Sequence, residues 1–313
     1  MKLPGAFFRL VRWPNLVFII LTQVLFEYCV FRRAYGQDAL YPGEEKQFWL
    51  LVIASVLIAA AGYIINDYFD LNIDQVNKPD KVVVSVIINR RWVIFWHMFL
   101  SLLGLFFTVT ALPMLQYWHL VIANLASIVL LWLYSTNLKR QLLVGNILIS
   151  LLTAWTIGIL YFSKYPFNIS KFFNANVHEV RFFRLTIVYM SFAFIISLIR
   201  EVIKDMEDVE GDRKYGCRTM PIVWGMNASK VFVAVWIIVL VAALLILQIY
   251  VLQFGWWMSA LYCLVFIVAP LIWILLKLFK ARQAADFHRL STAVKLVMLT
   301  GILSMLFFQA YYP

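Results

Sequence analysis

The chain has 313 residues, of which 64% are hydrophobic and 14% are charged, and its formal net charge is +11. Soluble domains are closer to half apolar and a quarter charged, so this composition excludes an ordinary soluble protein and indicates an integral membrane protein. The positive charge does not indicate nucleic-acid binding, because Lys and Arg lie between the apolar runs, as membrane topology requires. The three cysteines are far apart and show neither disulfide nor metal-ligand spacing.

Nine apolar runs follow one another along the chain, and each approaches the roughly 20 residues that a helix needs to cross a bilayer. Backbone polar groups must be paired inside hydrocarbon, and the runs are too long for barrel strands, so each run predicts a transmembrane helix. The runs cover residues 14–31, 48–67, 92–111, 117–135, 142–162, 185–203, 231–252, 257–279 and 291–311. We therefore expect an all-α, polytopic membrane protein that forms one domain over residues 1–313.

The basic residues predict the orientation of these spans. Most of the 27 Lys and Arg residues precede span 1 or follow spans 2, 4, 6 and 8. Because Lys and Arg concentrate in cytoplasmic segments, we expect the N-terminus inside and the C-terminus outside, in the cell inner membrane.

Two nonapeptides at the ends of apolar runs have matching acidic patterns. "NDYFDLNID" at 66–74 follows span 2, and "KDMEDVEGD" at 204–212 follows span 6. Spans 2 and 6 run in the same direction, so both nonapeptides are expected on the cytoplasmic side. Four helices lie in the interval, which suggests two related four-helix halves plus a ninth helix. The aspartates stand at positions 2, 5 and 9 of each: Asp67, Asp70 and Asp74, then Asp205, Asp208 and Asp212.

In a continuous helix, residues at i, i+3 and i+7 lie within about 60° of one another, so each triplet predicts an acidic stripe. The carboxylates of a stripe repel one another, and the negative end of the helix dipole repels them as well. A cation is therefore expected beside each stripe. All-oxygen ligands suit Mg²⁺, which binds proteins through one or two carboxylates together with substrate phosphates. The pattern therefore predicts Mg²⁺ and a diphosphate leaving group, with Lys204 as a charge for a phosphate oxygen.

These motifs resemble those of a known family. "NDYFDLNID" matches the N-D-x-x-D-x-x-x-D motif of the UbiA superfamily of intramembrane prenyltransferases, and "DMEDVEGD" matches its second acidic motif. "RLVRWPN" at 9–15, "LYSTNLKR" at 133–140 and "STAVKLVMLTG" at 291–301 resemble further segments of that family. The resemblance implies nine helices around a central chamber that opens to the membrane. It also implies Mg²⁺-dependent transfer of a polyprenyl group from its diphosphate to a lipophilic acceptor.

Carried over by motif position, the resemblance assigns roles to individual residues. The implied metal ligands are Asn66, Asp70, Asp74, Asp208 and Asp212, with Asp67 and Asp205 as supporting ligands. The residues implied to hold the diphosphate or to stabilise the allylic cation are Lys139, Tyr134, Asn15 and Arg218. After the first motif, "NKPDKVVVSVIINRRW" departs from the family's Arg-Pro…Gly pattern, although Lys78, Pro79 and Lys81 occupy a similar place.

The segment "REVIKDMEDVEGDRKYGCRTMPI" is most similar to digeranylgeranylglyceryl phosphate synthases, which alkylate a hydroxyl of a prenylglyceryl phosphate. Aromatic prenyltransferases of quinone biosynthesis share its D-x-E-G-D-R portion and are the second interpretation. An intramembrane terpene cyclase would use the same metal site. A divalent-cation transporter would place its acids near the midplane of broken helices, whereas these acids lie at one membrane face.

Overall fold

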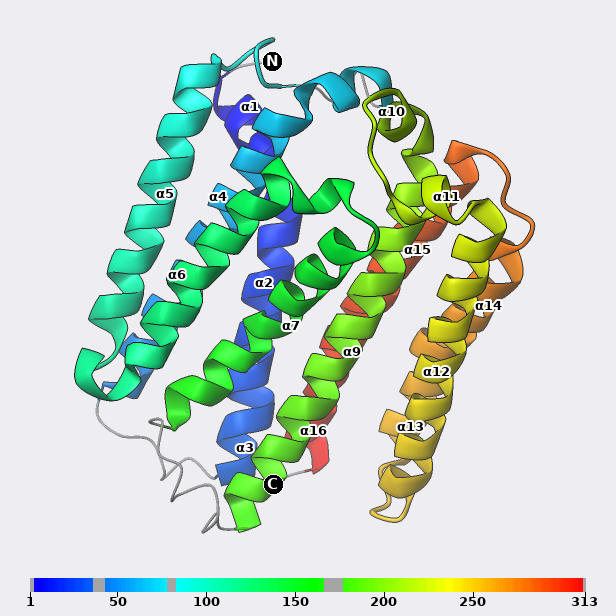
Figure 1. The fold of residues 1–313 in the computed structure, drawn as a ribbon. Helices are drawn as coiled ribbons and strands as arrows, with labels where there is room; N and C mark the ends of the chain where they lie inside the picture. The colour runs from blue at the N-terminus through cyan, green and yellow to red at the C-terminus, as the bar shows by residue number, and fades with distance from the viewer. Residues whose placement is uncertain (1–2, 36–42, 78–82, 166–176, 312–313) are drawn as a thin grey trace. The chain divides into compact units, whose positions relative to one another are not determined.

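The computed structural model describes residues 3–35, 43–77, 83–165 and 177–311. Within these ranges, nine helical segments are long and apolar enough to cross a membrane, which confirms the predicted all-α membrane fold (Figure 1). The segment with Lys78, Pro79 and Lys81 lies outside the described residues. The nine segments are Trp13–Phe31, Glu44–Asn77, Arg90–Ala111, Met114–Thr136, Val144–Lys164, Val177–Glu207, Met226–Leu252, Trp257–Leu278 and Ala284–Tyr311.

Several of these segments are interrupted or preceded by short helical elements. The first consists of α2 (Trp13–Leu25) and a π-helical turn η1 (Phe26–Phe31), and the eighth contains a second π-helical turn, η5 (Leu264–Val268). The long helices are α4 (Glu44–Asn77), α5 (Arg90–Ala111), α6 (Met114–Thr136), α7 (Val144–Lys164), α9 (Val177–Glu207), α12 (Met226–Leu252) and α15 (Ala284–Leu303). The shorter elements are α1 (Leu3–Leu10), α3 (Arg32–Tyr35), η4 (Leu138–Arg140), α10 (Val209–Lys214), α11 (Met220–Val223), α13 (Trp257–Cys263), α14 (Ala269–Leu278), η6 (Ser304–Leu306) and α16 (Phe307–Tyr311).

Two helices extend well beyond the apolar runs that predicted them. α4 has 34 residues and α9 has 31, whereas the predicted spans were 48–67 and 185–203. Hydropathy marks only the part of a helix that lies in hydrocarbon, so polar turns that continue the same helix are not detected. The extension matters because the polar end of α4 carries the whole first nonapeptide.

The chain forms two compact units, and each contains one acidic nonapeptide. The first unit comprises Met1–Val24, Tyr35–Lys139 and Trp155–Thr186. The second comprises Leu25–Ala34, Arg140–Ala154 and Ile187–Pro313. Residues 66–74 therefore belong to the first unit, and residues 204–212 belong to the second.

In the first unit, α4 packs against α5 and α6 through small residues (Figure 1). A Cβ atom on Gly104 of α5 would lie 2.8 Å from Ile58 Cγ1 and 3.3 Å from the backbone oxygen of Ala54. A Cβ atom on Gly62 of α4 would similarly lie 2.9 Å from Leu131 Cδ1 of α6. Glycine at these positions lets the helices approach closely, as is common in membranes.

Buried polar side chains in the same unit are paired across its helices. A ring nitrogen of His97 on α5, Nδ1, lies 2.9 Å from the backbone oxygen of Ala61 on α4. The Asn124 amide of α6 donates to Thr108 Oγ1 of α5 at 2.8 Å. Such bonds satisfy groups that would otherwise be costly to place in hydrocarbon.

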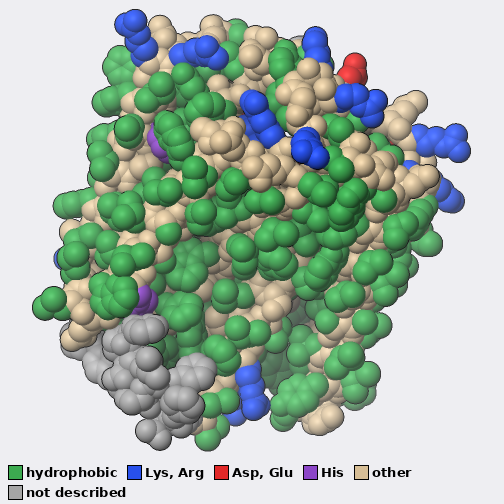
Figure 2. Space-filling model, in the orientation of Figure 1, with side chains coloured by type: hydrophobic (Ala, Val, Ile, Leu, Met, Phe, Trp, Pro, Cys, Tyr) green, Lys and Arg blue, Asp and Glu red, His purple; other side chains and the backbone are tan. Residues whose placement is uncertain are grey.

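In the second unit, a hydrophobic cluster joins α9, α12, α14 and α15. Its fully buried members include Ile199, Ile237, Leu271 and Val294. Other large apolar side chains of this unit face outward, among them Ile246 of α12, which is 69% exposed. Figure 2 shows hydrophobic side chains over most of the visible surface. Lipid tails are the solvent that suits such a surface, which agrees with an integral membrane protein.

We expect Gly104→Val to destabilise the protein by about 1–3 kcal/mol, because the added side chain overpacks the contact with Ile58 and Ala54. Thermal unfolding of the purified protein in detergent measures the change. Leu102→Val on the same helix is the control, since Leu102 is 68% exposed and its truncation opens no cavity. Equal unfolding temperatures for Gly104→Val and the wild type would contradict close packing at this position.

Candidate active site

The first acidic nonapeptide lies entirely on α4, so its three aspartates share one helical face as predicted. No Gly or Pro occurs between residues 63 and 77, so the helix continues beyond the apolar run without a break. Asn66, Asp70 and Asp74 follow one another at intervals of four residues on that helix. Their oxygen atoms therefore line one side of it.

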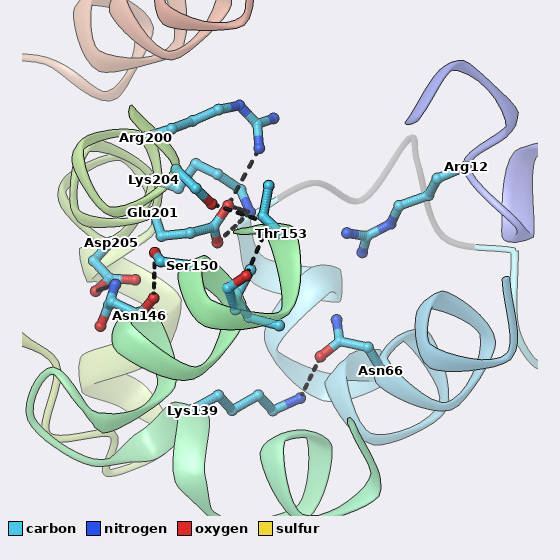
Figure 3. A network of polar contacts seen from close by, with 12 residues as sticks. Arg12, Asn66, Lys139, Asn146, Ser150, Thr153, Arg200, Glu201, Lys204 and Asp205 are labelled. Carbon is cyan, nitrogen blue, oxygen red and sulfur yellow. Dashed lines mark hydrogen bonds and ion pairs between the residues drawn. The ribbon is translucent and has the colours of Figure 1, made fainter. Parts of the chain in front are cut away.

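The structure brings together three of the predicted site residues, Asn66, Asp70 and Lys139. Lys139 lies in η4, directly after α6, and its Nζ is 2.5 Å from Asp70 Oδ1. The same Nζ is 3.3 Å from Asn66 Oδ1 (Figure 3). The Asn66 amide nitrogen donates to Asp70 Oδ2 at 2.7 Å. Both oxygens of Asp70 are thus bonded, and a positive charge lies against the acidic stripe.

Asp67 has a partner that the sequence analysis did not assign. Arg12, between α1 and α2, places its Nη2 at 2.6 Å from Asp67 Oδ1, and its guanidinium lies 5.3 Å from the centroid of the Tyr63 ring. Arg12 has a φ of 51°, a conformation that costs non-glycine residues energy and is concentrated at functional sites. The Asp67 carboxylate raises the pKa of the Arg12 guanidinium above its ordinary value, so Arg12 keeps its charge. Arg12 was visible in "RLVRWPN", but one arginine in an interfacial segment does not reveal its partner.

The second nonapeptide does not continue its helix, so the prediction of a single stripe there is wrong. α9 ends at Glu207, Asp208 has φ −96° and ψ 8°, and α10 begins at Val209. Acidic residues at the negative end of a helix dipole and a glycine at 211 both disfavour a continuous helix here. The break leaves Asp212 buried, with its backbone oxygen accepting from the Cys217 N–H at 2.9 Å.

Asp205, at the start of this motif, is bound by a second residue that the sequence analysis missed. The amide nitrogen of Asn146 on α7 donates to Asp205 Oδ2 at 2.8 Å (Figure 3). Asn146 is buried inside an otherwise apolar run. A buried amide requires a hydrogen-bond partner, so this polar residue was a usable signal.

The other predicted residues lie in different surroundings. Lys204 Nζ is 2.9 Å from Glu201 Oε2, one turn earlier on α9. Arg218 is exposed, and its backbone N–H donates to the backbone oxygen of Arg140 at 2.8 Å. The backbone N–H of Asn15 donates to the Arg12 oxygen at 2.8 Å, and Tyr134 lies half-buried in the last turn of α6.

The donor atoms of the two motifs suit a hard cation. Carboxylate and amide oxygens are the ligands that Mg²⁺ takes, and it completes its shell with water and phosphate instead of a full protein cage. In the described part of the chain, no three His, Cys, Asp or Glu side chains form a group that could hold a metal by themselves. The ammonium of Lys139 beside Asp70 shows that this face of α4 attracts positive charge.

Comparison with known proteins agrees with this chemistry. The model of the UbiA prenyltransferase family matches residues 33–307. Digeranylgeranylglyceryl phosphate synthase of Methanothermobacter thermautotrophicus is 34% identical over 257 residues, which are 79% of this chain and 81% of that protein. The Saccharolobus solfataricus protein of the same name is 27% identical over 266 residues, which cover 84% of this chain and 85% of that protein.

Solved structures share the fold. A UbiA homologue from Archaeoglobus fulgidus, bound to GPP and Mg²⁺, superimposes with a TM-score of 0.57 at 14% identity, covering 96% of this chain and 99% of that one. The fold, the acidic motifs and the family match together define an intramembrane prenyltransferase. The chain belongs to the UbiA prenyltransferase family.

We expect Arg12→Met to destabilise the protein, because it leaves the Asp67 carboxylate at the membrane edge without its cation. Adding Asp67→Asn should recover part of the loss, and the coupling between the two sites should be about 1–3 kcal/mol. Thermal unfolding of the two single variants and the double variant measures this coupling. The control is Arg91→Met, which removes an exposed arginine at the start of α5. Additive effects would show that the pair contributes nothing to stability.

Proposed function

We propose that this prenyltransferase transfers a geranylgeranyl group from its diphosphate to the hydroxyl of a prenylglyceryl phosphate, forming an ether lipid. Sequence similarity supports this substrate pair. The relative that is 34% identical over most of both chains is a digeranylgeranylglyceryl phosphate synthase. The long segment around the second acidic motif, residues 200–222, also resembles synthases of that kind.

We further propose that the two acidic motifs bind the diphosphate through Mg²⁺. Magnesium, when bound there, neutralises the leaving group as a Lewis acid and orients it. The supporting observation is the oxygen-rich face of α4, which attracts a cation in the form of Lys139. The proposed ligands are Asn66, Asp70, Asp74, Asp208 and Asp212, with Asp67 and Asp205 in supporting positions.

The remaining roles follow from charge and position. Lys139, placed at the acidic face by Asp70, provides an ammonium for a phosphate oxygen. Arg12 and Asn146 position Asp67 and Asp205 through the bonds described above. Tyr134, Asn15 and Arg218 are proposed to contact the diphosphate or the allylic carbon. In the reaction the C1–O bond to the diphosphate breaks, the acceptor oxygen bonds to C1, the hydroxyl proton is released and diphosphate departs.

We propose that this chemistry takes place at the cytoplasmic membrane face, with the N-terminus inside and the C-terminus outside. The basis is the distribution of Lys and Arg along the sequence. An acceptor that carries a phosphate can reach such a site from the membrane plane while its charged headgroup stays near water.

Purified protein in detergent should form a radiolabelled ether from geranylgeranyl diphosphate and geranylgeranylglyceryl phosphate when Mg²⁺ is present. EDTA should abolish the product and added Mg²⁺ should restore it. Asp70→Asn and Asp208→Asn should each reduce kcat/KM about a hundredfold or more, because each removes charge that acts on the leaving group. Glu210→Gln, an exposed acid between the same motif's aspartates, is the matched control.

A naphthoate acceptor, offered in parallel, decides between the two acceptor classes. Prenylated naphthoate without ether product would replace the lipid acceptor by an aromatic one and retain the mechanism. Diphosphate released equally with and without either acceptor, together with a cyclised hydrocarbon, would indicate a terpene cyclase. Absence of diphosphate release with every donor would contradict the proposed reaction.

The proposed orientation predicts opposite labelling of two introduced cysteines. Gln141→Cys, after η4, should react with a membrane-impermeant maleimide only from the cytoplasmic side, and Gln253→Cys, after α12, only from the other side. The native cysteines, Cys29, Cys217 and Cys263, are buried and provide a low background. The reverse pattern in sealed vesicles would overturn the orientation.

A further inference from the structure

A group of three cations lies at the contact between α9 and α15 in the second unit. Arg200 and Lys204 are on α9, and Lys295 is on α15. The helices pack side by side in the hydrophobic cluster of that unit, where Ile199 and Val294 are both buried (Figure 1). Lys204 is the first residue of the second nonapeptide, whereas Arg200 and Lys295 lie outside both acidic motifs.

Contacts along the two helices show that they run antiparallel. Tyr189 Oη lies 3.2 Å from Ser304 Oγ, just beyond the end of α15, and His288 Nδ1 lies 2.9 Å from Glu207 Oε1. Between these levels, a Cβ atom on Gly301 would lie 2.4 Å from Phe192 Cε1. Residue numbers along α9 therefore increase in the direction in which residue numbers along α15 decrease.

This register places two like charges opposite each other. At 100° per residue, Arg200 lies on the same face of α9 as Tyr189 and Glu207, the face that contacts α15. Interpolation between the contacts places Lys295 level with Arg200. The positive charges of Arg200 and Lys204 accordingly act on the Lys295 ammonium.

One carboxylate balances part of this charge. Glu201 accepts from Arg200 Nη1 at 3.2 Å and from Lys204 Nζ at 2.9 Å (Figure 3). The Arg200 Nε atom is buried and has no hydrogen-bond partner in the described part of the chain. Asp205, the next acid on α9, accepts a hydrogen bond from Asn146 and also interacts with the charge of Lys204.

Ionisable residues inside a membrane helix pair are costly, and such residues usually mark a binding site. A phosphate monoester carries about −1.5 to −2 charges near pH 7 and three acceptor oxygens. It would remove the repulsion, and it would provide an acceptor for the buried Arg200 Nε. Arg and Lys are also the side chains that proteins use for phosphate.

We propose that Arg200, Lys204 and Lys295 bind the phosphate of the acceptor lipid, an inference that rests on the proposed function and assigns Lys204 to the acceptor in place of the donor diphosphate. Glu201 holds Arg200 and Lys204 in place. Lys204 precedes Asp208 of the second motif by one helical turn, and the Asp208 N–H donates to the Lys204 backbone oxygen at 2.9 Å. A phosphate bound at this cation cluster therefore lies within a glyceryl headgroup's reach of the second acidic motif. The Mg²⁺ sites bind the donor's diphosphate, and the cation cluster selects the acceptor.

Acceptor kinetics test this assignment. Arg200→Gln and Lys295→Met should each raise the KM for geranylgeranylglyceryl phosphate about tenfold or more, as expected for losing one charge-assisted bond to phosphate. The KM for geranylgeranyl diphosphate should be unchanged, and the preference over unphosphorylated geranylgeranylglycerol should fall. Arg289→Gln, which removes an exposed arginine of α15, is the matched control. A raised donor KM with an unchanged acceptor KM would overturn the proposal.

Thermal unfolding provides a readout that does not depend on turnover. Geranylgeranylglyceryl phosphate should raise the unfolding temperature of the wild type, whereas geranylgeranylglycerol and inorganic phosphate should raise it less. Lys295→Met should lose this shift. Equal shifts in Lys295→Met and the wild type would overturn the assignment. So would a shift by Mg²⁺-diphosphate that the variants lose.

The two proposals fail in different ways. If the wild type forms no ether but is stabilised selectively by the phosphorylated lipid, the proposed reaction fails and the phosphate site remains. If the wild type forms ether and the variants use the phosphorylated acceptor normally, the reaction stands and the role of the cation cluster is refuted.

Discussion

The cost of charge beside hydrocarbon governs how the polar parts of this protein are built. Acidic residues lie at the ends of membrane helices, where repulsion and the helix dipole both act against them. Three of these carboxylates have bonded partners in the structure: Asp70 is bound by Lys139, Asp67 by Arg12 and Asp205 by Asn146. These partners come from segments distant in sequence, so the carboxylates are held in place by tertiary contacts and not by their own helix alone.

The same constraint relates the two kinds of charged cluster in the protein. The acidic motifs suit a divalent cation and its diphosphate, whereas Arg200, Lys204 and Lys295 suit an anion. An enzyme that joins a prenyl diphosphate to a phosphorylated lipid must handle two anionic headgroups separately. Under the proposed function, the acidic motifs would hold the donor's diphosphate through Mg²⁺ and the cation cluster would hold the acceptor's phosphate.

Sequence patterns predicted much of this arrangement because they report on local physics. Apolar length predicts a membrane helix, and the matching aspartate spacing predicts a cation site, whatever the remaining contacts are. The same reasoning failed at Asp208, where a helix was assumed to continue. It also predicted α4 and α9 to be shorter than they are, because hydropathy detects only the part of a helix that lies in hydrocarbon. It also missed Arg12 and Asn146, whose partners lie 55 and 59 residues away along the chain.

The sequence by itself determined the membrane class, the helical fold, the family and the acidic motifs, because each depends on composition or on spacing within one segment. Only the tertiary structure decided which cation meets which carboxylate, where α9 ends, and that Lys295 lies level with Arg200. The physical reason is that an ion pair depends on distance in space. Distance in space is set by helix packing, which depends on small residues such as Gly104 and Gly301. The sequence shows where these glycines are but not which side chains they contact.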